Sequence, residues 1–212
     1  FVFDPDTGTY EDLSAPRGYG TPLVFDDPAA GQVALPLPWD DDSNARAIAL
    51  DGGEVLWSSP IERGGWARSV IIADDAPLFV FGDHDGRLHA LEASSGRRLW
   101  SVDVQQTSLA WGPAVEARAD ASVLWIGDTD SGDLVSISSS GEVLERLSVG
   151  VDGPVAVAEE DVVLGHSRDG LVALRGGETL WTRAGEFAKV DFVVADLDSD
   201  GEPELMVLTQ DG

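Results

Sequence analysis

The sequence predicts an all-β fold built by repetition of one unit. Clear copies of the unit occupy residues 49–57, 90–100 and 173–181, and weaker copies occupy residues 1–13 and 135–147. Each clear copy has a short apolar run, a turn that contains glycine, and a second apolar run that ends in tryptophan. In the copy at residues 135–147, Glu145 stands at the tryptophan position. Such self-similarity indicates a repeat architecture.

The period of the repeat predicts a β-propeller. Its turn glycines recur every 36 to 45 residues, at Gly8, Gly53, Gly96, Gly141 and Gly177. A period in the low forties, made of short β-type runs and polar turns, is typical of one four-stranded propeller blade per repeat. Helical repeats need longer apolar runs with 3.6-residue spacing, and the 24 glycines and 11 prolines interrupt every candidate. We therefore expect essentially no helix.

Hairpin signals divide the chain into blades of a single domain, residues 1–212. Complete four-stranded blades are expected at about residues 19–62, 63–106, 107–150 and 151–187. Residues 188–212 supply only the first two strands of a blade, and residues 1–18 supply only the last two. We expect pairing of these N- and C-terminal strands to close a ring of five blades, which would remove its exposed edges. A part of a seven- or eight-bladed ring is the alternative.

Composition favours cations and basic partners over nucleic acid. The chain has 39 acidic and 13 basic residues and a net charge of −26, which repels phosphate backbones and anionic membranes. No stretch approaches the roughly 18 apolar residues of a membrane span, so we expect no membrane insertion within this chain. The lack of cysteine excludes disulfides and catalytic thiols. Because the chain starts at Phe1 with no visible export signal, we expect a processed or excised segment of an extracellular or cell-envelope protein.

An acidic loop between two apolar runs is the candidate metal site. Three aspartates alternate and a glycine follows them, at Asp196, Asp198, Asp200 and Gly201. Calcium takes six to eight oxygen ligands, and the five carboxylates within residues 196–204 repel one another unless a cation is present. An EF-hand would need a glutamate at position 207, which is valine, and would need helical flanks. The loop therefore predicts a calcium β-hairpin; a solvated acidic turn is the alternative.

Two family resemblances extend this interpretation. The A-L-x-x-x-x-G-x-x-L-W units, preceded by D-G-x-L, resemble the pyrroloquinoline-quinone-type repeat of quinoprotein propellers and of non-enzymatic relatives that act as binding scaffolds. That resemblance implies that the tryptophan docks neighbouring blades. The segment VADLDSDGEPELMV resembles the FG-GAP or VCBS propeller repeat, which carries a calcium loop. It implies that the Glu202 carbonyl and the Glu204 carboxylate complete the calcium shell.

The remaining tryptophans are candidates for a ligand surface. Trp57, Trp100 and Trp181 hold the docking position of the repeat and are expected to pack between blades. Trp66 and Trp111 lie at strand ends beside Gly-Gly or Gly-Pro turns. Exposed aromatic side chains there would be binding hot spots by residue type.

The function predicted from the sequence is a non-enzymatic, calcium-stabilised, extracellular binding or scaffold propeller that recognises protein or glycan. The alternative is a propeller enzyme, either a glycan-cleaving hydrolase or lyase or a fragment of a quinoprotein dehydrogenase. The sequence contains no G-x-S-x-G, H-E-x-x-H, phosphate loop or dinucleotide fingerprint. No catalytic or organic-cofactor residue is singled out, and calcium is the only cofactor predicted.

Overall fold

The computed structural model describes residues 2–4, 9–11, 23–36, 44–61, 70–72, 77–83, 85–104, 112–118, 121–158, 162–187, 193–198 and 204–208. These ranges consist of antiparallel β-strands and their turns, which confirms the predicted all-β architecture. They include no helix long and apolar enough to cross a membrane.

Four four-stranded sheets follow one another along the chain, and in each sheet strands that are consecutive in sequence pair with one another. Blade 1 contains β3 (Leu23–Asp27), β4 (Gly31–Leu35), β5 (Asn44–Ala49) and β6 (Val55–Pro60). Blade 2 contains β7 (Val70–Ile72), β8 (Leu78–Gly82), β9 (Arg87–Glu92) and β10 (Arg98–Asp103). Blade 3 contains β11 (Ala114–Glu116), β12 (Val123–Asp128), β13 (Asp133–Ser138) and β14 (Val143–Ser148). Blade 4 contains β15 (Val151–Val157), β16 (Val162–Ser167), β17 (Gly170–Arg175) and β18 (Glu178–Ala184).

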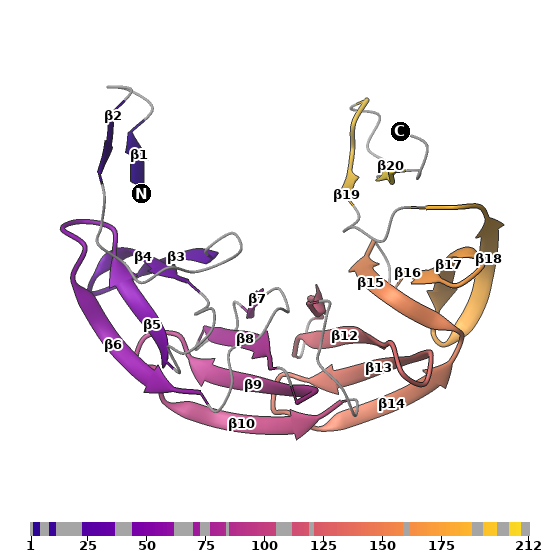
Figure 1. The fold of residues 1–212 in the computed structure, drawn as a ribbon, viewed down its shortest axis with the longest axis horizontal. Coiled ribbons are helices and arrows are strands. Elements are labelled where there is room, and N and C mark those ends of the chain that lie inside the picture. Colours follow the sequence, from indigo (N-terminus) through magenta and orange to yellow (C-terminus); the bar gives the residue numbers. More distant parts are fainter. Residues whose placement is uncertain are drawn as a thin grey trace.

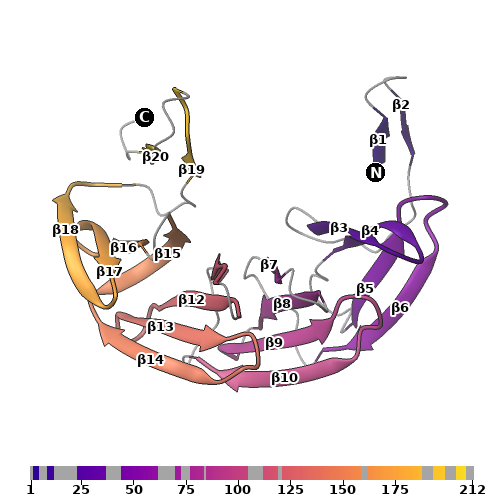
Figure 2. The ribbon, with the colours of Figure 1, turned by 180° about the vertical axis from the view of Figure 1, so that it is seen from behind.

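The blades are arranged as an open arc (Figure 1). The first strand of each blade lies toward the hollow of the arc, and β6, β10, β14 and β18 form its convex rim. The view from behind shows the same order of blades (Figure 2). Each blade is a meander of four strands, and the blades follow one another around an axis. This is the propeller arrangement that the repeat period predicts.

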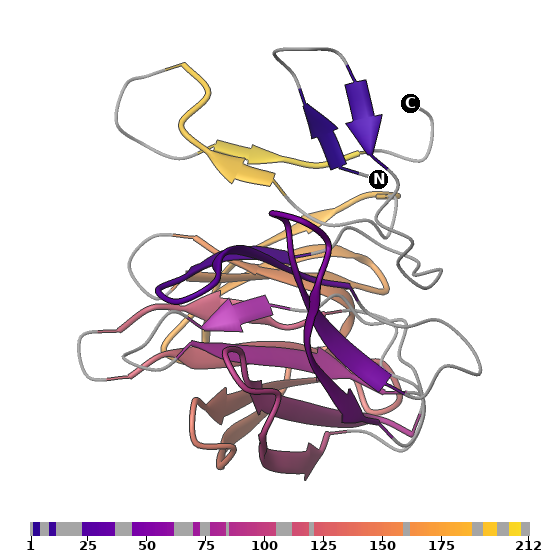
Figure 3. The ribbon, with the colours of Figure 1, turned by 90° about the vertical axis from the view of Figure 1, so that its left-hand side faces the viewer.

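In the described residues, the strands near the two chain ends pair as two separate hairpins. One hairpin pairs β1 (Val2–Asp4) with β2 (Thr9–Glu11), and a separate one pairs β19 (Val193–Ala195) with β20 (Glu204–Met206). The hairpins extend from opposite ends of the arc (Figure 1) and on the same side of the four blades (Figure 3). The number of blades in a closed ring stays a prediction.

The hydrophobic core lies between neighbouring blades. In β8, Phe79 and Phe81 pack against blade 1, whereas Leu78 and Val80 pack against blade 3. Successive side chains of a strand point to opposite faces of the sheet. Because blade 2 has a neighbouring blade on each side, side chains on both faces of β8 are buried. This explains why β8 reads as a continuous apolar run rather than as an alternating one.

Candidate functional site

Tryptophans join blade 1 to blade 2 and blade 2 to blade 3. The Trp57 indole donates from Nε1 to the Ala93 carbonyl, 2.8 Å away, and its ring covers Gly96 in the turn between β9 and β10. Trp100 repeats the contact one blade later: it donates to the Ser139 carbonyl at 2.9 Å and covers Gly141. These indoles close the outer part of each interface, as the sequence resemblance implies.

Trp181 holds the same strand position in blade 4 but differs from the expected packing, because 42% of it is exposed. The next sheet along the chain, β19–β20, is described as two strands only, without the outer turn that receives an indole elsewhere. Trp181 instead borders an open cleft of about 680 Å³ together with Phe187 and Leu205.

The C-terminal hairpin brings together three of the predicted calcium ligands. One carboxylate oxygen from each of Asp196, Asp198 and Glu204 lies within 4.8 Å of the other two. The Leu197 amide donates to Glu204 Oε2 at 2.7 Å, which draws the end of the loop toward its start. Asp196 and Asp198 are exposed and Glu204 is half-buried. Three convergent oxygen donors fit a hard cation such as calcium.

Four residues of the predicted sites cannot be placed in this way. Asp200 and Glu202 of the calcium loop lie outside the described residues, as do Trp66 and Trp111 of the candidate ligand face. The roles given to them above stay predictions.

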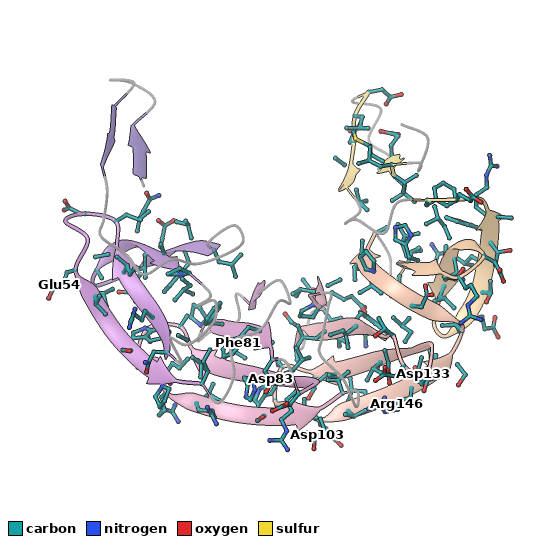
Figure 4. The ribbon with its side chains drawn as sticks, viewed as in Figure 1. Glu54, Phe81, Asp83, Asp103, Asp133 and Arg146 are labelled. Atoms are coloured by element: carbon teal, nitrogen blue, oxygen red, sulfur yellow. The ribbon has the colours of Figure 1, made fainter. Side chains whose placement is uncertain are left out.

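A buried polar network in blade 2 was not predicted from the sequence. Nε2 of His89 lies 2.8 Å from Asp83 Oδ2, and its Nδ1 lies 3.0 Å from Ser101 Oγ. Asp83 Oδ1 also accepts hydrogen bonds from the amides of Asp85 and Arg87, at 2.8 and 2.9 Å. Asp83 and His89 are each only 1% exposed. The network therefore ties the β8–β9 turn to β9, which carries His89, and to β10, which carries Ser101. Figure 4 labels Asp83.

The Asp83 network has the residue types of a nucleophilic triad, but Asp83 and His89 are buried inside the sheet and link its strands like a structural brace. The His89 ring stacks on Phe81, with 5.4 Å between centroids, inside the interface with blade 1. Blade 3 builds a related brace without histidine: Arg146 Nη1 lies 3.5 Å from Asp128 Oδ2, and its Nη2 donates to the Val104 carbonyl at 2.8 Å. The property that the two networks share is that they link neighbouring strands.

Burial raises the pKa of Asp83, but other effects outweigh it. The hydrogen bond from His89, the amide hydrogen bonds, and the positive charge of the His89 ring when protonated all lower the pKa, which lies below the usual aspartate value. The carboxylate is thus held ionised in a buried place, where it accepts hydrogen bonds on both oxygens.

A polar cleft of about 580 Å³ opens between blades 3 and 4. Its walls include the β12–β13 turn, with Asp130 and Ser131, and the β16–β17 turn, with Arg168 and Asp169. Charges of both signs at exposed turn positions are suited to polar contacts with a partner rather than to burial of an apolar ligand.

Comparison with known proteins identifies the fold. Among solved structures, BamB from Moraxella catarrhalis is 18% identical, with a TM-score of 0.61, and the match covers 99% of this chain and 67% of that one. Saccharomyces cerevisiae Sqt1 is 14% identical, with a TM-score of 0.70 and coverage of 98% and 62%. BBS1N in complex with ARL6DN is 9% identical, with a TM-score of 0.65 and coverage of 90% and 62%. The chain thus spans roughly two thirds of each, and identities this low establish the fold alone.

No curated protein matches the chain in sequence. A family model does match it, over residues 41–184, which is more than half of the chain and runs through the blades joined by Trp57 and Trp100. That model describes the outer membrane protein assembly factor BamB, and this chain belongs to its family.

Proposed function

We propose that this chain is a non-enzymatic scaffold propeller that binds a protein partner in the cell envelope or outside the cell. The observation that carries the proposal is the family match over residues 41–184, whose description names an assembly factor of outer membrane proteins. A second observation agrees with a protein partner rather than a glycan: the similar BBS1N propeller was solved in complex with another protein, ARL6DN.

The charge of the chain indicates which partners it would favour. A net charge of −26 attracts basic surfaces and speeds encounter with them. The polar cleft between blades 3 and 4 offers Asp130 and Asp169 on its turns, with Arg168 beside them. We assign the partner-binding face to these turns because exposed loops on a rigid β scaffold commonly carry binding residues.

Calcium belongs to the proposal as a stabiliser. Asp196, Asp198 and Glu204 would supply carboxylate ligands to the ion, which would offset their mutual repulsion and hold the two ends of the loop together. In this proposal the ion would stabilise the β19–β20 hairpin, at the end of the arc remote from blade 1.

Site-specific photo-crosslinking tests the proposal. A benzoylphenylalanine at Arg168, in the cleft, should cross-link one discrete protein from a detergent extract of the source envelope. The same group at Glu54, in the turn between β5 and β6, is the matched control, and Figure 4 shows Glu54 at the other end of the arc. Equal labelling from both positions, or release of reducing sugar from envelope glycans by the purified chain, would contradict a protein scaffold.

A further inference from the structure

The interface between blades 3 and 4 lacks the indole that closes the two preceding ones. On β10, Trp100 pairs with Ala90, and Ala90 pairs with Val80. The same row in blade 3 is Glu145 on β14, paired with Ser136, which pairs with Trp125. An apolar row that ends in an indole has thus become a row that ends in a carboxylate.

A cleft lies where the missing indole would be. It has a volume of about 440 Å³, within the roughly 300–1,000 Å³ usual for small-ligand sites. Its walls combine Glu145 and Leu144 of β14 with the Gly176–Gly177 turn of blade 4. A Cβ built on Gly177 would meet the Leu147 methyl carbon at 3.4 Å and Glu145 Oε1 at 3.7 Å, both at ordinary contact distance. The turn glycine of blade 4 is therefore not covered by a ring as Gly96 is.

The cleft pairs an aromatic wall with one available negative charge. Trp125 lines it and donates from Nε1 to Glu116 Oε2 at 2.6 Å. Arg118 also lines it, but its guanidinium donates to both oxygens of the buried Glu116, so much of its charge is neutralised. Glu145 is exposed, and its carboxylate makes no hydrogen bond or ion pair with the part of the chain that the structure describes.

We propose that this cleft binds a tryptophan side chain from a partner segment with basic flanking residues. The incoming indole takes the place that Trp57 and Trp100 take at the other two interfaces, with its ring against the Gly176–Gly177 turn. Its N–H donates to the Glu145 carboxylate. Lysine or arginine beside it is favoured by Glu145 and by the net charge of −26. This assignment goes beyond the proposed function and does not depend on where the chain works.

A peptide titration tests the proposal without knowledge of the natural partner. Acetyl-Lys-Trp-Lys-amide is added to the whole chain, and amide chemical shifts are followed by NMR. The Gly176 and Gly177 amides should shift in a saturable way. The same peptide with leucine in place of tryptophan should give no saturable shift, and acetyl-Glu-Trp-Glu-amide should bind more weakly. Saturable shifts around the exposed Trp181 instead of the Gly176–Gly177 turn would overturn the assignment.

Two variants sharpen the test. Glu145→Trp supplies the missing indole from the chain itself. It should raise the Tm and weaken peptide binding by at least about tenfold. Glu54→Trp adds an exposed indole elsewhere and should bind the peptide as the unchanged chain does. Glu145→Gln keeps the cleft and removes only one charge, so it should retain binding but show a smaller preference for lysine over glutamate flanks. Unchanged affinity in Glu145→Trp would refute the proposal, and it would leave the photo-crosslinking result unaffected.

Discussion

The indole of Trp57 covers Gly96 of the next blade so closely that a Cβ added to Gly96 would stand 2.4 Å from Trp57 Cε3. Gly96 also has a φ of +70°, which L side chains rarely adopt. The turn glycine of the repeat is therefore required twice, once by its own backbone and once by the tryptophan of the preceding blade.

Gly96→Ala should destabilise the protein more than a glycine substitution that meets only the backbone requirement. Gly31→Ala is the matched control, because Gly31 has a φ of +73° and nothing within 4 Å of an added Cβ. We expect Gly96→Ala to cost about 1–3 kcal/mol more than the control, the usual range for overpacking. Urea unfolding of both variants measures this difference, and equal losses would show that the indole moves aside freely.

The tryptophans should differ in their contribution to stability according to whether a blade covers them. Trp100→Ala removes a ring packed between blades 2 and 3 and its hydrogen bond to Ser139, so we expect a loss approaching the roughly 3–5 kcal/mol of a buried tryptophan. Trp181→Ala removes a ring that is 42% exposed and should cost clearly less. Thermal unfolding of both variants checks this order. The reverse order would place Trp181 in a packed interface.

The Asp83 carboxylate should make stability depend on pH in the acid range. Its folded-state pKa lies below the unfolded value of about 3.9, so it stabilises the fold above that pH, and this contribution is lost as the pH falls through the folded pKa. Asp83→Asn keeps an acceptor oxygen but cannot ionise. In urea unfolding, the unchanged chain should have a higher free energy of unfolding than the variant at pH 6, and this difference should shrink below about pH 4. If the difference in free energy of unfolding stays constant with pH, the charge of Asp83 is not its cause.

The strands and the packing of Trp57 and Trp100 between blades could be predicted from the sequence, because both depend on the pattern of residues within one repeat. The apolar run at residues 78–81 and the recurrent glycine-to-tryptophan spacing require no knowledge of the remaining chain. The partnership of Asp83 with His89 depends on strand register and was missed. A histidine within the apolar run of β9 was the signal that could have found it.

The open arc was harder to predict. The chain ends read as the two halves of one blade because the join between residues 209–212 and the start of the chain resembles a turn within a blade. Whether the halves meet depends on the angle between blades, which is set by side chains such as Trp57 and Trp100 packed between sheets. That angle has no signature in the repeat period. The glutamate at position 145 was visible in the sequence, but the cleft beside it needed the facing Gly176–Gly177 turn.

Calcium should stabilise the β19–β20 hairpin in particular. We expect added calcium to raise the Tm, and Asp198→Ala to abolish the rise because it removes one of three convergent carboxylates. Asp51→Ala, in the exposed turn between β5 and β6, is the control and should leave the calcium response intact. Hydrogen exchange in chelator should speed up at the hairpin before the blades. Uniform acceleration would argue against a local site.

The most direct test of the protein-scaffold account is calorimetric titration of the chain with the purified partner identified through the Arg168 cross-link. We predict saturable binding that weakens steeply as salt is raised from low to physiological concentration, because an acidic chain of charge −26 meets a basic partner. Charge reversal at Asp169, beside Arg168 in the polar cleft, should weaken it further. Absence of saturable binding, or binding indifferent both to salt and to Asp169→Lys, would contradict the account.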